Sequence, residues 1–138
     1  VKGGGCMAIS PDGPRGPRMR AGLGAIQLAK LSGAPIVLFA WSTKRRIVFN
    51  SWDRFVMPLP FGEGYLLWGG PMIVPADATA EEMETLRARL ELDLINLTQE
   101  ADRLAGVEIT QPADPNERRR RRKDSEPQAD NADLETLG

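Results

Sequence analysis

The residues best suited to chemistry lie in one short loop that is rich in proline, glycine and charge. Residues 10–18 read Ser-Pro-Asp-Gly-Pro-Arg-Gly-Pro-Arg. Prolines fix φ and lack an N–H group, so they stop strand pairing, while glycines leave backbone amides uncovered. Guanidinium groups and exposed amides together can hold a phosphate, although a plain turn between two elements is the alternative. We predict an anion-binding loop formed by Asp12, Gly13, Pro14, Arg15, Gly16 and Arg18.

The rest of the chain offers little for catalysis. Asp12 lies among cations, so we expect it to stay ionised and to orient its neighbours rather than to act as a base. The chain contains no histidine, which is the commonest general base. Its one cysteine, Cys6, excludes an internal disulfide framework and a cysteine-rich zinc site, and we expect it to be inert packing. We therefore predict no catalytic residue, metal site or cofactor in these 138 residues.

Charge is divided unevenly along the chain. Residues 1–75 contain nine Lys and Arg against three Asp and Glu, whereas residues 76–138 contain nine against sixteen. The basic half is where an anionic headgroup or a phosphate would bind, although solvation of a small surface also produces such an imbalance. The longest apolar run, residues 34–41, is too short to cross a bilayer. A peripheral contact with an anionic surface fits this pattern better than a membrane span.

Hydrophobic patterning predicts an α/β fold over residues 1–106, with a mixed sheet and flanking helices. The apolar runs 6–9 and 34–41 are typical of buried strands, and residues 22–32 have helical spacing that ends at Gly33. This order predicts a right-handed βαβ crossover and a parallel strand pair. Shorter extended segments follow, at residues 46–49, 54–61 and 64–69.

A long amphipathic helix is predicted over residues 79–104. Thr79 and Glu82 have the spacing of a capping box, and Gly106 follows where a helix would end. Apolar side chains then recur every three or four residues, at Met83, Leu86, Leu90, Leu94, Leu97, Ala101 and Leu104. We expect this stripe to pack on the sheet, with a seam for a partner helix as the alternative.

After Gly106 the composition changes. Residues 107–138 are polar and charged with almost no aliphatic side chains, so we expect a disordered tail. Residues 118–123 are five arginines and a lysine. They could bind RNA or an anionic leaflet, or simply form a solvated block of charge.

Several of these segments resemble one protein family. Pro11-Asp12-Gly13-Pro14-Arg15 is similar to the Pro-Glu-Gly-Thr-Arg block of the lysophospholipid (glycerolipid) acyltransferase superfamily. Residues 33–37, Gly-Ala-Pro-Ile-Val, resemble a later block of that superfamily, an apolar strand entered through a proline. The runs 10–17, 31–36 and 51–55 are especially similar to an uncharacterised bacterial branch, and the resemblance covers roughly residues 3–104.

The resemblance implies acyl transfer from acyl-CoA or acyl carrier protein to the hydroxyl of a lipid acceptor. Gly13 and Arg15 would hold the phosphate or polar head of the acceptor, with Asp12 in the acidic position of the block. Asp12 and Pro14 replace the usual Glu and Thr, so the acceptor need not be a glycerol phosphate. The family's catalytic His-x4-Asp lies upstream of these blocks, so we expect this chain to be a C-terminal portion that is inactive alone.

The resemblance also implies a cytoplasmic protein that is peripheral on the inner face of the cell membrane, with nucleic acid not expected as a partner. Aromatic side chains beside cations agree with an anionic membrane surface, although core packing is their other possible fate. The aromatic residues are Trp41, Trp52, Phe55, Phe61 and Trp68, and the cations are Lys44, Arg45, Arg46 and Arg54. A non-catalytic binding module for anionic membrane or nucleic acid is the alternative function.

Overall fold

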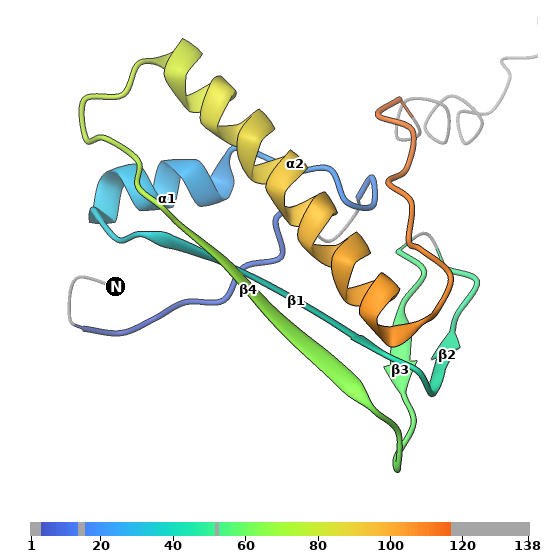
Figure 1. The fold of residues 1–138 in the computed structure, drawn as a ribbon. Coiled ribbons are helices and arrows are strands. Elements are labelled where there is room, and N and C mark those ends of the chain that lie inside the picture. The colour runs from blue at the N-terminus through green and yellow to red at the C-terminus, as the bar shows by residue number, and fades with distance from the viewer. Residues whose placement is uncertain (1–3, 14–15, 52, 117–138) are drawn as a thin grey trace, which may run out of the picture.

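The computed structural model describes residues 4–13, 16–51 and 53–116. Six elements follow one another in the order α, β, β, β, β, α (Figure 1). They are α1 (Gly24–Ser32), β1 (Ile36–Thr43), β2 (Arg46–Val48), β3 (Val56–Pro58), β4 (Gly64–Met72) and α2 (Ala80–Ala105). The predicted mixed α/β class is therefore confirmed.

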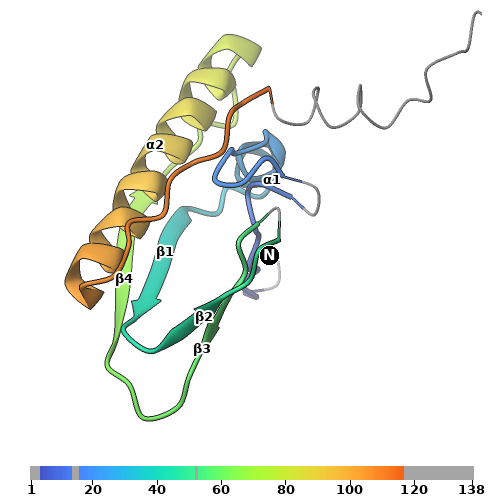
Figure 2. The same cartoon turned by 90° about the vertical axis from the view of Figure 1, so that its right-hand side faces the viewer.

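The strands form two small antiparallel sheets. β1 pairs with β4, with Phe39 opposite Trp68 and Trp41 opposite Leu66, and β2 pairs with β3 in a hairpin. Helix α2 lies along one face of the β1–β4 sheet, and the hairpin projects from the far end of β1 (Figures 1 and 2). A helix on one face of a two-stranded sheet is thus the main layer arrangement.

The predicted parallel βαβ pair is wrong. Residues 6–9 are exposed and form no strand, and β1 pairs with β4 in the antiparallel direction. The chain reverses through the β2–β3 hairpin and returns as β4, which supplies the hydrogen bonds that β1 needs. Cys6 is consequently an exposed thiol instead of core packing.

Helix α2 confirms the prediction made from its capping box. The Glu82 N–H donates to Thr79 Oγ1 at 3.2 Å, and the Thr79 N–H donates to Glu82 Oε2 at 2.7 Å. Gly106 ends the helix in the left-handed region. Both ends of α2 therefore follow from local sequence signals.

The apolar stripe of α2 faces the sheet for most of its length. Leu90 is 2% exposed and Ala101 is fully buried, while Leu86, Leu94 and Leu97 are partly buried. Leu104 departs from the prediction, since it is 45% exposed. Ala101, Asp102 and Ala105 take the inward positions in the last turns, which rotates Leu104 outward.

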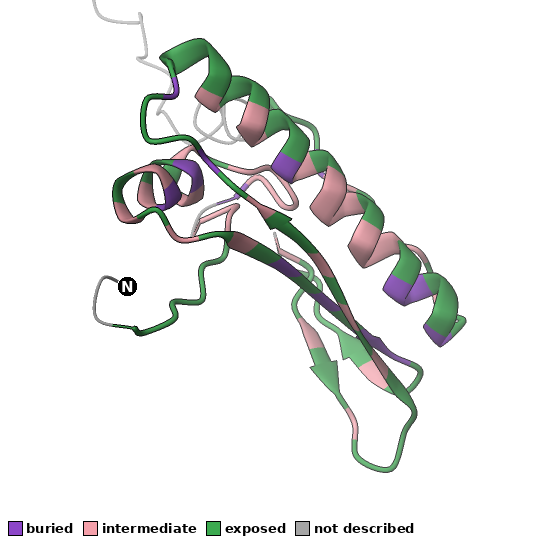
Figure 3. Ribbon diagram, turned by 60° about the vertical axis from the view of Figure 1, so that its left-hand side comes forward, coloured by how far each residue is buried: buried purple, intermediate pink, exposed green. Residues whose placement is uncertain are grey.

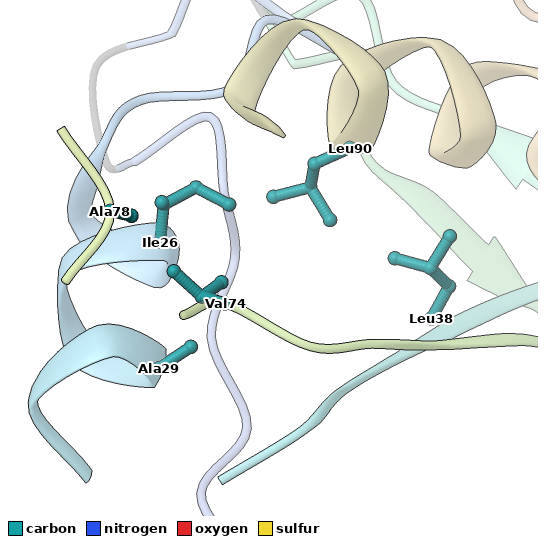
Figure 4. Packing of buried hydrophobic residues seen from close by; sticks show 6 residues of the cluster. All are labelled: Ile26, Ala29, Leu38, Val74, Ala78 and Leu90. Atoms are coloured by element: carbon teal, nitrogen blue, oxygen red, sulfur yellow. The ribbon is translucent and has the colours of Figure 1, made fainter. Parts of the chain in front are cut away.

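The core is small and joins both helices to β1 (Figure 4). Its buried members are Ile26, Ala29, Leu38, Val74, Ala78 and Leu90. Helix α1 contributes two of them and ends as predicted, because Gly33 adopts φ 69° and its N–H donates to the Ala29 carbonyl at 2.8 Å. A left-handed residue at this position favours glycine.

On the face of the β1–β4 sheet turned away from α2, several large apolar residues are exposed. They are Val37, Phe39, Trp41, Leu66 and Trp68. Figure 3 shows exposed and buried residues alternating along β1. The Phe39 and Trp68 rings lie with centroids 4.9 Å apart. Trp41, Phe55, Phe61 and Trp68, for which core packing was the alternative to a membrane contact, are thus exposed, and Trp52 lies outside the described residues.

Residues 107–116 do not fit the disordered tail predicted from residue 107. They run back beside α2 and reach the loop before α1, as Figure 2 shows in orange. Main-chain hydrogen bonds hold this segment without an aliphatic cluster, and Ala113 is buried. The remaining predicted tail, with its arginine tract at 118–123, lies outside the described residues. Among the described residues, no helix is long and apolar enough to span a membrane.

Truncation of Leu90 tests the α2–sheet packing. Leu90→Ala is expected to lower the free energy of unfolding by about 2–5 kcal/mol, because it opens a cavity between α2, α1 and β1. Leu92→Ala on the same helix, where the side chain is 58% exposed, is the matched control with little expected effect. Urea denaturation measures both, and equal effects of the two substitutions would contradict this packing.

Candidate functional site

The loop that was predicted to bind an anion is a tight, internally bonded turn. The Gly13 N–H donates to the Ser10 carbonyl at 3.2 Å, and Gly13 adopts φ 66°, a conformation that L side chains rarely take. The Gly16 N–H donates to the Gly13 carbonyl at 3.5 Å. Pro14 and Arg15 lie outside the described residues.

Asp12 braces this loop from within. Its Oδ1 accepts from the Ser10 hydroxyl at 2.8 Å, and its Oδ2 accepts from the Met19 N–H at 3.3 Å. The Gly22 N–H also donates to the Pro11 carbonyl at 2.8 Å. Asp12 therefore orients the loop backbone, in line with the orienting role predicted for it.

Arg18 faces the C-terminal segment. Its Nε and Nη2 both donate to the Gln111 carbonyl, at 3.2 and 2.9 Å, and its own carbonyl accepts from the Ala113 N–H at 3.0 Å. A hydrogen bond from Ser51 and, to a smaller extent, the positive charge of Arg18 lower the pKa of Asp53 at the tip of the β2–β3 hairpin. Arg18 thus lies where the loop, the hairpin tip and the C-terminal segment approach one another.

The end of the loop is fastened to α2 by Glu91. Its carboxylate accepts from the Ala21 N–H at 2.9 Å, from Arg20 Nη1 at 3.0 Å and from Arg87 Nη1 at 2.9 Å. Burial raises the pKa of Glu91, but these hydrogen bonds outweigh the burial and the pKa stays below its ordinary value. Glu91 is consequently an ionised, fully engaged group at the edge of the site.

Beside the loop lies a cavity of about 240 Å³ between β1 and α2. The polar residues that line it are Ser10, Asp12, Glu91 and Thr98, beside Pro11. The apolar residues that line it are Met19, Ala21, Leu94 and Ile95, together with Phe39, Ala40 and Trp41 of β1. The Phe39 and Trp41 side chains themselves point to the face of the sheet away from α2. A second, more open hollow lines the β4 side of α2 and shares no residue with the first. The first cavity therefore has both polar and apolar lining residues.

The sequence reasoning missed a buried polar cluster at the C-terminal end of α2. Asp102 is 2% exposed, and its Oδ1 accepts from the Ser42 hydroxyl at 2.6 Å and from Arg46 Nη1 at 2.9 Å. Its Oδ2 accepts from the Thr110 N–H at 2.8 Å. Arg46 Nη2 also donates to the Glu108 carbonyl at 2.9 Å. An acidic residue in the last turn of a helix is unfavourable, because it lies beside the negative end of the helix dipole. The position of Asp102 in the last turn of α2 was therefore the sequence signal that could have indicated this cluster.

These contacts determine the protonation state of Asp102. Burial raises the pKa of its carboxyl, but hydrogen bonds from Ser42, Thr110 and Arg46 outweigh the burial, and the pKa lies below its ordinary value. The carboxylate therefore stays charged at neutral pH and holds β1, β2 and the C-terminal segment together. Asp102 therefore has a structural role, because hydrogen bonds from within the chain satisfy both of its carboxylate oxygens.

The described residues include no group of three or more His, Cys, Asp or Glu side chains that could hold a metal ion. The structure brings Asp12, Gly13, Gly16 and Arg18 together in one loop beside the cavity. It directs Arg18 toward Gln111. The loop can thus offer polar contacts to one end of a ligand whose other end is apolar.

Comparison with known proteins found a relative in Rickettsia prowazekii (strain Madrid E), named "Uncharacterized protein RP090". The two chains are 29% identical over 93 residues, which cover 67% of this chain and 40% of the relative. The chain therefore spans about two fifths of the length of that relative. No family model matches the chain, and no solved structure matches it significantly.

Replacing Asp102 by asparagine tests the buried cluster through its pH dependence. A carboxyl whose folded pKa is lowered stabilises the fold above its unfolded pKa of about 4, and this contribution is lost as the pH falls through the folded value. Asp102→Asn is expected to lower the free energy of unfolding by about 1–3 kcal/mol at pH 7. The difference from the wild type should shrink below about pH 4.

Asp93→Asn, which removes a solvent-exposed partner of Arg89 on the same helix, is the control. It should change stability little at any pH, since exposed pairs contribute about 0–1 kcal/mol. Denaturation across pH 2.5–7 (roughly the range of carboxyl titration) measures both variants. A pH-independent loss in Asp102→Asn would show that its charge does not stabilise the fold.

Proposed function

We propose that this chain is part of an acyltransferase-like protein that moves an acyl group from acyl-CoA or acyl carrier protein to a lipid acceptor. In this proposal the loop 10–18 contacts the polar head of the acceptor, and the chain by itself is inactive. The fold assignment that accompanies it, an acyltransferase-like α/β domain, rests on the resemblance of the Pro-Asp-Gly-Pro-Arg and Gly-Ala-Pro-Ile-Val blocks.

The observation that carries the proposal is that the loop lines the cavity together with apolar residues of α2. Ser10 and Asp12 line the same space as Leu94 and Ile95. An amphipathic ligand needs this combination, because a few polar groups orient its head while apolar residues bury its chain. A purely polar acceptor would leave the apolar lining unused.

The roles of the loop residues divide accordingly. Gly13 sits in a positive-φ turn with open space where a Cβ would lie, so an acceptor head group can approach the backbone closely. Asp12 keeps the turn in shape through Ser10 and Met19. Arg15 is the cation that the sequence resemblance assigns to the head group, and it lies outside the described residues.

A non-catalytic module that binds an anionic membrane is the second candidate function. One specific observation favours it, which is that none of the 138 residues is a histidine. The two candidate functions predict different sequences upstream of residue 1. A His-x4-Asp sequence in the same reading frame supports the acyltransferase, and an upstream coding region without it contradicts the acyltransferase.

Substitution of Arg15 tests the head-group role in a protein that carries the upstream block. Arg15→Ala is expected to raise the acceptor KM by about tenfold to a hundredfold, because charge-assisted hydrogen bonds contribute about 1.5–3 kcal/mol. Arg15→Lys should restore part of the affinity, since the charge remains and the planar fork is lost. Arg89→Ala, on the exposed side of α2, is the control. A lower melting temperature with an unchanged acceptor KM would show that Arg15 only braces the turn.

Membrane association is a separate part of the proposal and involves the β2–β3 hairpin and the turn that follows it. Phe61 is 96% exposed, and Arg45 Nη1 donates to the Phe61 and Pro60 carbonyls, which places a cation beside the backbone of this residue. Phe49 and Phe55 are also exposed, with ring centroids 6.1 Å apart. Aromatic rings beside cations favour the interface of an anionic bilayer.

Vesicle flotation tests this association. The wild-type chain is expected to float with vesicles that contain phosphatidylglycerol and much less with pure phosphatidylcholine, since Arg45 and Arg54 attract anionic headgroups. Phe61→Ser combined with Arg54→Glu should reduce flotation by several fold, whereas Leu92→Ser on α2 should not. Flotation that is indifferent to the anionic lipid and to the paired substitution would contradict the membrane contact.

A further inference from the structure

We infer that residues 107–113 act as a strap that positions the described part of the loop, residues 10–13 and 16–18, beside the cavity, and that buried Asp102 holds this strap in place. Two sets of contacts carry the inference. One set joins the strap to the C-terminal end of α2, and the other joins it to the residues that follow the loop. The consequence for acceptor binding rests on the proposed function, but the positioning itself does not.

The first set fixes the start of the strap. The Thr110 N–H donates to Asp102 Oδ2 at 2.8 Å, and the Glu108 carbonyl accepts from Arg46 Nη2 at 2.9 Å. Gln99 Nε2 also donates to the Thr110 carbonyl at 3.3 Å. Asp102 and Arg46 are themselves largely buried, with side-chain exposures of 3% and 11%. The strap is therefore attached to a largely buried ion pair, and movement of this pair would expose its charges to solvent.

The second set fixes residues 18–20 to the end of the strap. The Ala113 N–H donates to the Arg18 carbonyl at 3.0 Å, and Arg18 donates twice to the Gln111 carbonyl. Arg20 Nε donates to the Ala113 carbonyl at 2.9 Å. Ala113 is buried, so its N–H bond to Arg18 is shielded from competing water, whereas the two Arg18–Gln111 bonds are exposed.

Residues 18–22 connect the strap to the loop through hydrogen bonds. The Met19 N–H donates to Asp12, and the Gly22 N–H donates to the Pro11 carbonyl, so the start of the loop is bonded to the segment that the strap holds. Glu91 fastens the same segment from the side of α2. The loop is thus positioned from two directions, by a helix and by the strap. Without the strap, Glu91 and Arg87 of α2 would still hold residues 20–21, and the loop would gain freedom at Arg18.

A substitution at Thr110 separates the strap from its anchor. Thr110→Pro removes the N–H that donates to Asp102, whereas Thr110→Ala keeps this N–H and serves as the matched control. Hydrogen exchange of the full 138-residue chain then reports on the amides of Met19, Ala21 and Gly22. We expect Thr110→Pro to accelerate their exchange by at least about tenfold while amides in the middle of α2 and β1 are unchanged. Unchanged exchange at residues 19–22 in a folded Thr110→Pro chain would overturn the inference.

The wild-type chain provides a measurement that does not depend on a variant's folding. In native-state exchange with increasing urea, the Thr110 and Ala113 amides and the amides of residues 19–22 are expected to open together, below the opening free energy of α2. Independent opening, with Ala113 exchanging freely while residues 19–22 stay protected, would show that the strap does not position the loop.

Acceptor kinetics of Thr110→Pro, in a protein carrying the upstream block, then distinguish this inference from the proposed function. Faster exchange together with a raised acceptor KM and an unchanged donor KM supports both. Faster exchange with an unchanged acceptor KM supports the strap and contradicts the head-group role of the loop. Slow exchange in the loop contradicts the strap whatever the kinetics show.

Discussion

Burial of one face of α2 on one face of the β1–β4 sheet is the interaction on which the rest of the structure depends. An isolated two-stranded ribbon is at best marginally stable in water, so β1 and β4 need a helix to cover them. Leu90 meets Ile26 and Leu38 at the place where α2, α1 and β1 converge. The loop is attached to the middle of α2 through Glu91, and the C-terminal strap is attached to the end of α2 through Asp102.

Polar contacts attach further segments to this layer. Asp102 joins the C-terminal end of α2 to β1, β2 and Thr110, and Glu91 joins the middle of α2 to the end of the loop. Buried carboxylates are costly unless they are fully bonded. Here each one accepts several hydrogen bonds, so the cost is offset and the attached segments are placed with definite geometry.

The sequence predicted those elements whose signals are local. The Thr79–Glu82 capping box and the glycines at 33 and 106 indicated the ends of the helices, and the apolar run at 34–41 indicated β1. Strand partners could not be predicted in the same way, because pairing depends on residues far apart in the chain. The parallel pairing expected for residues 6–9 is the clear failure, since β4 pairs with β1 instead.

The candidate site was predictable only in part. The Pro-Gly composition of residues 10–18 indicated a turn, and Asp12 and Gly13 adopt one. The prediction that the glycine amides stay uncovered is wrong, because the Gly13 and Gly16 N–H groups donate to carbonyls within the loop. The strap was missed because residues 107–138 as a whole have a polar composition typical of disorder, whereas residues 107–113 are held largely by hydrogen bonds from side chains far away in the sequence, such as those of Arg18, Arg20 and Arg46. The cavity could not be predicted, because it is lined by residues from the loop, β1 and α2 that lie far apart in the chain.

Trp41 provides the most direct measurement of the central claim, which is that the loop and the cavity bind an amphipathic acceptor. In a Trp52→Phe, Trp68→Phe chain, Trp41 is the remaining tryptophan and lines the cavity. Titration with a single-chain lysophospholipid below its micelle concentration should shift the Trp41 emission to shorter wavelength and saturate, whereas glycerol 3-phosphate should produce no shift. An emission spectrum that does not change with the lysophospholipid, in a chain that remains folded, would contradict the claim.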